Sequence, residues 1–123
     1  IWGKKHDDVA VHELVRLRSG QGEPLMIETS YLPVKRFPSL DIERLENGSL
    51  YDFLTAAYGF EIHNVRETLR PVMPLPQEKE LLQITGTLPC ILLERFTYEN
   101  SACAEYTKSI VRGDKYIFSV ELK

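Results

Sequence analysis

A predicted β-hairpin near the N-terminus constrains the fold of this chain most strongly. Residues 9–31 hold two stretches of strand-forming residues on either side of Gly20-Gln21-Gly22. A three-residue loop, with Gly22 in the left-handed conformation, predicts that Ser19 pairs with Glu23. Side chains alternate between the faces of a strand, so this pairing also predicts which residues share a face.

The two predicted faces of the hairpin differ in chemistry. We expect one to be core, and it carries Val15, Leu17, Leu25, Ile27 and Tyr31. The other carries Leu14, Arg16, Arg18, Met26, Glu28 and Ser30. A polar face of this kind is most often solvated sheet. Two guanidinium groups beside a carboxylate also fit a site for an anionic, hydroxyl-bearing small molecule, so both interpretations remain open.

Composition restricts the class of protein. The 123 residues are 43% hydrophobic and 27% charged, which is typical of one soluble globular domain. The net charge of −3 argues against a nucleic-acid-binding surface. No apolar run approaches the roughly 20 residues of a membrane span, and no secretory signal is present, so we expect a cytoplasmic location. Because the chain begins at Ile1 and not at methionine, we expect a fragment of a longer polypeptide. Residues 1–8 are polar, so we interpret them as an entry linker and 9–123 as the domain.

The cysteines and histidines predict neither a disulfide nor a metal site. A turn at Asn100-Ser101 pairs Cys103 with Tyr98 and leaves Cys90 far along the same hairpin. No CxxC spacing occurs, and the three histidines are scattered along the sequence. We therefore expect no metal and no cofactor.

One helix is clearly predicted, over residues 50–58. Leu50, Leu54 and Tyr58 follow helical spacing, Ser49 is placed as the N-cap and Gly59 follows the end. The start of such a helix presents free backbone N–H groups and can hold a phosphate or carboxylate. Most capped helix starts have only a structural role, so this feature alone does not decide between the two.

The remaining segments predict an α+β domain, in which an antiparallel sheet carries short helices. We expect a helical turn over 34–37, a strand over 61–73 and a helix over 76–84 with Leu81, Leu82 and Ile84 facing inward. A second hairpin is predicted over 88–98 and 102–111, and a last strand over 112–122.

Glu105 stands out in the second predicted hairpin. The expected register sets Glu105 opposite Phe96 and Ser109 opposite Leu92 on one face, with Tyr106 and Lys108 on the other. A carboxylate on a largely apolar face needs a partner, which is either a protein donor or a ligand.

Several motifs in this order resemble a known family. RLRSGQGEPLMIETSYLP, FPSL, SLYDFL with YGF, ELLQI, LLERFTYEN and EYTKSIVRGDKY together resemble the UTRA domain, the effector-binding half of HutC-type regulators in the GntR superfamily. The resemblance covers about residues 11–122. It implies a chorismate-lyase-like α+β fold, a homodimer, and a winged helix-turn-helix domain preceding Ile1 through which DNA would be bound.

The resemblance also implies roles for single residues. Arg16, Arg18 and Ser49 match positions that hold a phosphate in the sugar-phosphate-responsive members, and Tyr51 matches a position in the same pocket. Glu28 and Glu105 resemble carboxylates that accept hydrogen bonds from the sugar. Val111 stands where many relatives have an aromatic residue, so a contact with the ligand is expected to be absent there.

The function implied by the resemblance is ligand sensing by a transcription regulator, with a phosphorylated sugar or amino sugar as the small-molecule effector. A non-sugar anion, similar to urocanate or a phosphonate, is an alternative effector. A chorismate-lyase-like enzyme is a less favoured alternative, because fold does not carry function and the helix start suits phosphate. A dimerisation module with a vestigial pocket is a third.

Overall fold

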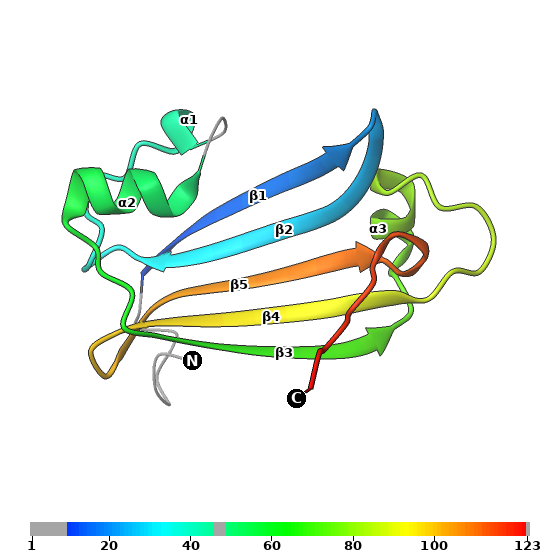
Figure 1. The fold of residues 1–123 in the computed structure, drawn as a ribbon. Helices are drawn as coiled ribbons and strands as arrows, with labels where there is room; N and C mark the ends of the chain where they lie inside the picture. The colour runs from blue at the N-terminus through cyan, green and yellow to red at the C-terminus, as the bar shows by residue number, and fades with distance from the viewer. Residues whose placement is uncertain (1–9, 46–48, 123) are drawn as a thin grey trace.

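The computed structural model describes residues 10–45 and 49–122, so the predicted linker over residues 1–8 lies outside the described residues. Five strands form one antiparallel sheet in the order β1-β2-β5-β4-β3 (Figure 1). They are β1 (Val11–Gly20), β2 (Glu23–Pro33), β3 (Asn64–Val72), β4 (Cys90–Glu99) and β5 (Ala102–Arg112). The helices are α1 (Ile42–Leu45), α2 (Leu50–Tyr58) and α3 (Pro76–Leu81), followed by the 3-10 turn η2 (Gly113–Lys115). The predicted α+β class is confirmed.

The first hairpin has the predicted faces but a different register. Gly20 pairs with Glu23 across a two-residue turn, in which Gln21 and Gly22 both have positive φ. The predicted pairing of Ser19 with Glu23 is therefore wrong, since Ser19 pairs with Pro24. A bulge follows, and beyond it Arg16 pairs with Glu28. The register is displaced by two residues, and an even displacement leaves each side chain on its predicted face.

The expectation about which hairpin face is core holds for Ile27, which is buried, but is wrong for Val15 and Leu17, which are 55% and 46% exposed. Leu14 and Leu32, on the polar face, are buried. The polar face is the one that helices cover at its Leu14 end. We call this side of the sheet, carrying Leu14, Arg16 and Glu28, the arginine face.

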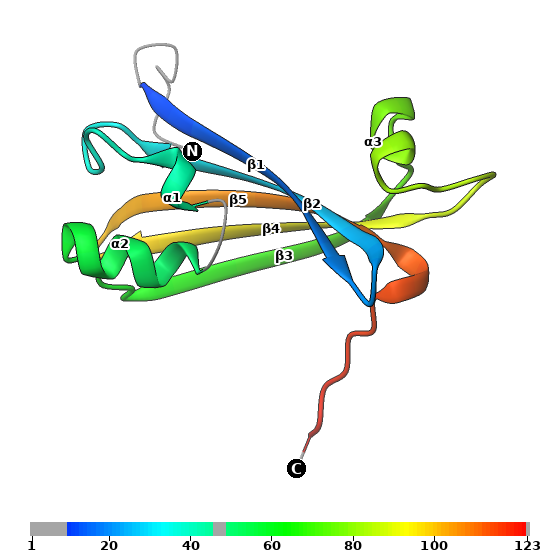
Figure 2. The same ribbon diagram turned by 90° about the horizontal axis from the view of Figure 1, so that it is seen from above.

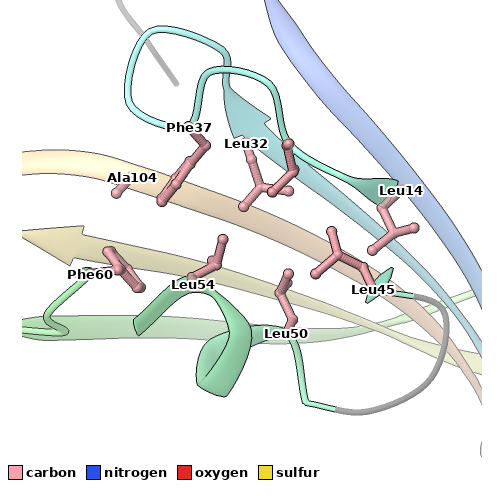
Figure 3. Close-up of a cluster of buried hydrophobic side chains, with 9 residues drawn as sticks. Leu14, Leu32, Phe37, Leu45, Leu50, Leu54, Phe60 and Ala104 are labelled. Carbon is pink, nitrogen blue, oxygen red and sulfur yellow. The ribbon is translucent and has the colours of Figure 1, made fainter. Parts of the chain in front are cut away.

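Helix α2 covers one end of the arginine face and forms as predicted. The Ser49 hydroxyl accepts a hydrogen bond from the Asp52 backbone N–H, and Gly59 ends the helix with a φ of 63°. The apolar side of α2 joins a core cluster with residues of β1, β2, α1 and β5 (Figure 3). This cluster consists of Leu14, Leu32, Phe37, Leu40, Leu45, Leu50, Leu54, Phe60 and Ala104. The predicted helical turn over 34–37 is confirmed by the bond from Phe37 N–H to the Pro33 carbonyl.

A second, smaller cluster lies on the opposite face, next to α3. It consists of Ile27, Leu82, Ile84 and Cys90. Figures 1 and 2 show α1 and α2 at one end of the strands and α3 at the other. Leu82 and Ile84 are buried as predicted, but Leu81 is 49% exposed and does not face inward.

The second hairpin contains an extra residue that the sequence prediction lacked. Tyr98 pairs with Cys103 as predicted, but Thr97 pairs with Glu105, so Ala104 forms a bulge in β5. The predicted pairs of Glu105 with Phe96 and of Ser109 with Leu92 are wrong, because the bulge displaces the register by one residue. An odd displacement exchanges the faces of β4 relative to β5. Both cysteines are free thiols. Cys90 lies opposite Arg112 in the pairing of β4 with β5, far from Cys103.

The last predicted strand, over 112–122, does not form. Gly113 starts a 3-10 turn, and a Cβ there would lie 2.1 Å from the Pro89 carbonyl oxygen. The chain then leaves the sheet (Figure 2). Within the described residues no strand pairs with 116–122, and strand-forming side chains such as Ile117 and Leu122 remain exposed. None of the described helices is long and apolar enough to cross a membrane.

Candidate functional site

Two arginines and a glutamate meet on the arginine face, where β1 and β2 pair. Glu28 lies directly opposite Arg16, and its Oε1 is 3.4 Å from an Arg16 terminal nitrogen and 3.8 Å from Arg18 Nε. Arg16 also donates to the Leu45 carbonyl at 3.4 Å, which ties this strand to the end of α1. These distances exceed those of a bidentate Arg–carboxylate pair, so Glu28 orients two guanidinium groups without engaging either fork fully.

The two arginines differ in exposure. The Arg16 side chain is 12% exposed and that of Arg18 is 45% exposed. Burial lowers the pKa of Arg16, the Glu28 carboxylate opposes that shift, and the positive charges of Arg18 and Arg95 add to it. An additional anion would therefore be attracted to this cluster of positive charge.

Glu105 is the most deeply buried charged residue of the core and is fully enclosed. Three hydroxyl groups donate to its carboxylate: Tyr51 at 2.9 Å, Thr97 at 2.7 Å, and Thr107. Thr107 is also 2.8 Å from the Ser30 hydroxyl on β2. Hydroxyl donors from α2, β4 and β5 thus satisfy the carboxylate that the sequence identified as needing a partner.

Tyr51 links the helix to the sheet. Burial raises its pKa, and the nearby Glu105 carboxylate adds to the shift, so its hydroxyl stays protonated and acts as a donor. On the other side, the Arg95 guanidinium carbon lies 5.1 Å from the centre of the Tyr51 ring. That distance is within the range of a cation–π interaction.

Ser49 has the capping role that the sequence predicts, with its Oγ 3.3 Å from Asp52 N. It is followed by Leu50, which packs in the same cluster as Leu14 and Leu45 (Figure 3). The start of α2 therefore lies over the end of the arginine face that carries Leu14, two positions before Arg16. Whether Ser49 contacts the same ligand as the arginines stays a prediction.

Residues absent from the sequence prediction complete this face. Arg95 and Thr97 join Glu105 because of the bulge at Ala104, Thr107 follows Glu105 by two positions on β5, and Ser30 joins through Thr107. The predicted register had placed Phe96 there instead of Arg95. Side chains alternate along β4 between two sets, Leu93, Arg95 and Thr97 on one face and Leu92, Glu94 and Phe96 on the other. The sequence does not reveal which of the two sets faces the helices.

Other chemistry is not assembled in the described part of the chain. Within residues 10–45 and 49–122, no three His, Cys, Asp or Glu side chains come together in a manner that would hold a metal ion. A largely apolar surface hollow of about 530 Å³ lies at the tip of β4 and β5, lined by Pro33, Arg36, Glu99 and Cys103 among others. None of the predicted ligand residues lines it, so its position does not support an effector site.

Comparison with curated proteins identifies transcription regulators. The profile of the UTRA domain family matches residues 6–117. The chain is 29% identical over 110 residues to the transcriptional repressor NagR of Bacillus subtilis, covering 89% of this chain and 45% of NagR. It is 26% identical over 112 residues to the regulator TreR of the same organism, covering 90% of this chain and 47% of TreR. The chain thus spans about half the length of these relatives.

Comparison with solved structures identifies effector domains. The effector-binding domain of the Bacillus subtilis trehalose repressor TreR superposes with a TM-score of 0.80 at 25% identity, covering 94% of this chain and 81% of that one. The effector domain of PhnF from Mycobacterium smegmatis gives a TM-score of 0.81 at 26% identity, covering 92% and 70%.

Proposed function

The chain belongs to the UTRA domain family, the effector-binding domain of GntR-family transcription regulators, and we propose that it senses a phosphorylated sugar or amino sugar on its arginine face. This proposal rests on one observation: positively charged groups and hydrogen-bonding carboxylate and hydroxyl groups lie on the same face of the sheet. Arg16 and Arg18 flank Glu28 at one end, and the enclosed Glu105 with Tyr51 lies at the other. An anion with several hydroxyl groups matches both ends.

Each end of the site recognises a different part of such a ligand. Guanidinium groups bind phosphate through paired, charge-assisted hydrogen bonds, and the half-exposed Arg18 is accessible to one. The free N–H groups at the Ser49 end of α2 add to the attraction for an anion. Glu28 accepts hydrogen bonds from the hydroxyl or amide groups of the sugar, and Glu105 does so in exchange for one of its three present hydroxyl donors.

In the full-length protein, the effector alters operator affinity through an attached winged helix-turn-helix domain, which would make the protein a repressor or a related regulator. This coupling requires the effector to bind the operator-competent and operator-incompetent states with different affinities. We further propose that two copies of the domain form a homodimer, which would suit a two-fold operator. Sedimentation showing only monomers at micromolar concentration would contradict the dimer.

Calorimetric titration tests the ligand class. Glucose 6-phosphate, glucosamine 6-phosphate and trehalose 6-phosphate are compared with their unphosphorylated parents and with inorganic phosphate. We expect at least one phosphorylated sugar to bind, and its parent to bind at least tenfold more weakly. Parents that bind as tightly as the phosphates would contradict the phosphate site and favour a neutral effector. Binding of urocanate or a phosphonate alone would favour the non-sugar alternative.

A charge-conserving substitution locates the phosphate. Arg18→Lys keeps the charge but loses the planar fork, so we expect it to weaken the phosphorylated sugar by about tenfold, or about 1.4 kcal/mol. Arg112→Lys is the matched control, because Arg112 pairs with Asp114 and donates to the Leu82 carbonyl on the opposite face of the sheet. Equal affinity of Arg18→Lys and the wild-type domain would remove Arg18 from the site.

A further inference from the structure

Arg95 has a buried hydrogen-bond donor for which the described part of the chain supplies no acceptor. Its Nε has no hydrogen-bond partner among the described residues, although the atom is shielded from solvent. Buried side-chain donors in folded proteins are nearly always paired, and each exception needs an explanation. A missing ligand atom is one such explanation.

The setting of Arg95 argues against a role confined to packing. It pairs with Thr107 across β4 and β5, and therefore projects from the arginine face together with Thr97 and Glu105. Its guanidinium group lies over the Tyr51 ring, whose hydroxyl donates to Glu105. The ring fixes the plane of the guanidinium group and leaves its edge to donate.

The carboxylate opposite Arg95 in the neighbouring strand does not supply the missing acceptor. Glu67 on β3 pairs with Arg95 and shares the arginine face, but it is exposed and does not bond the Arg95 Nε. The positive charge of Arg95 contributes to the lowered pKa of Arg16, so the two groups influence each other across the site. An additional negatively charged or strongly accepting oxygen would relieve both the repulsion and the unpaired donor.

Arg66 shows what an arginine does without such a constraint. It lies on β3 opposite Phe96, with its guanidinium carbon 4.7 Å from the centre of that ring. The stacking is similar, but Arg66 is exposed on the opposite face of the sheet, where its donors reach water. The difference between the two arginines is therefore burial beside the candidate site.

We propose that Arg95 is a third effector-binding arginine, whose Nε donates to an acceptor oxygen of the effector other than the phosphate oxygens held by Arg18. This inference rests on the proposed function. It deepens that function by requiring the effector to carry a second acceptor, such as a ring, carbonyl or carboxylate oxygen, on the side that meets Tyr51. Inorganic phosphate has no such second group.

The test compares Arg95→Met with Arg66→Met, since methionine keeps an unbranched stem and removes the guanidinium group. We expect Arg95→Met to weaken the best-binding sugar phosphate of the calorimetric panel at least tenfold and inorganic phosphate less than twofold. Arg66→Met should change neither by more than twofold. Thermal unfolding without ligand should show Arg95→Met at least as stable as Arg66→Met, because removal of an unpaired buried donor leaves nothing unsatisfied.

Three results would overturn the inference, and they differ in meaning. If the wild-type domain binds a sugar phosphate and Arg95→Met binds it equally well, Arg95 is not a ligand while the proposed function stands. If Arg95→Met loses markedly more stability than Arg66→Met, the role of Arg95 is structural. If the wild-type domain binds none of the phosphorylated probes, the proposed function fails and the assignment of Arg95 fails with it.

Discussion

The two ends of the sheet pack helices on opposite faces and bury different chemistry. At the α3 end, the cluster of Ile27, Leu82, Ile84 and Cys90 contains no charged side chain. At the α2 end, apolar packing borders a fully enclosed glutamate, three hydroxyl donors and Arg95, which lies over the Tyr51 ring. An apolar core stabilises without specifying a ligand, whereas buried polar groups need partners. We therefore expect substitutions at the α3 end to change stability alone, and substitutions at the α2 end to change both stability and binding.

The largest expected effect is at the α3 end. Leu82 is fully buried, so Leu82→Ala should lower the free energy of unfolding by about 2–5 kcal/mol, measured by urea denaturation. Affinity for a sugar phosphate should stay within twofold of the wild-type value. Leu81→Ala is the control, because Leu81 is adjacent and half exposed. A large change in affinity in a folded Leu82→Ala domain would break the proposed separation of the two ends.

The next effect tests the α2 end. Glu105→Gln places an amide N–H₂ among three hydroxyl donors and should cost about 1–3 kcal/mol of stability. It should also change the relative affinities for sugar phosphates that differ in their hydroxyl groups, while inorganic phosphate binding changes little. Glu94→Gln is the matched control, since Glu94 accepts from the Tyr106 hydroxyl at 2.6 Å on the opposite face. Equal effects of the two substitutions on ligand selectivity would argue against a special role for Glu105.

A smaller effect compares the two helix starts. Ser49→Ala removes the side-chain cap of α2 and should cost about 1 kcal/mol of stability. It should also weaken phosphate binding slightly. Glu78→Ala removes the bond from Leu75 N–H at the start of α3 and should affect stability only. Unfolding and affinity are measured on the same samples. Weaker phosphate binding by Glu78→Ala would indicate a general effect of destabilisation.

The smallest effect depends on pH. Arg36 donates two hydrogen bonds to Glu99, which holds the pKa of Glu99 below its ordinary value. A lowered folded-state pKa stabilises the domain above the unfolded pKa of about 4.3, and that stability is lost as the pH falls through the folded pKa. Glu99→Gln should remove roughly 0.2–1 kcal/mol at pH 7 and less at pH 3. A difference from wild type that grows toward low pH would contradict this assignment.

The sequence predicted the faces of the first hairpin better than its pairs. The predicted register was off by one residue because the turn is shorter, and by one more because of the bulge at Leu25. A register error of two residues leaves every side chain on its face, so Arg16, Arg18 and Glu28 still share one face. In the second hairpin a single error at Ala104 remained uncompensated, so Arg95 was missed. Helix α2 was predicted with its caps because those signals are local.

Features that depend on tertiary contacts were not predictable from local patterns. Which face of the first hairpin is core depends on where α1 and α2 pack, and Leu14 and Val15 are equally apolar. The segment 116–122 has strand-forming residues, but a strand also requires a neighbour with free backbone groups. The ligand-binding roles of Arg16, Arg18, Glu28, Ser49, Tyr51 and Glu105 stay predictions.

The extra residue at Ala104 makes chain length at the hairpin tip a determinant of site chemistry. Glu99, which pairs with Arg36, and Glu105, which binds Tyr51, project from the same side of the sheet because Ala104 adds one residue between them. In a hairpin of the same length without the bulge, Ala104 would lie opposite Thr97 and Tyr106 opposite Arg95, so neither Glu105 nor Thr107 would line the site. Deletion of Ala104 would instead remove the bulge and keep Glu105 opposite Thr97. Related domains should therefore gain or lose this residue together with the bulge.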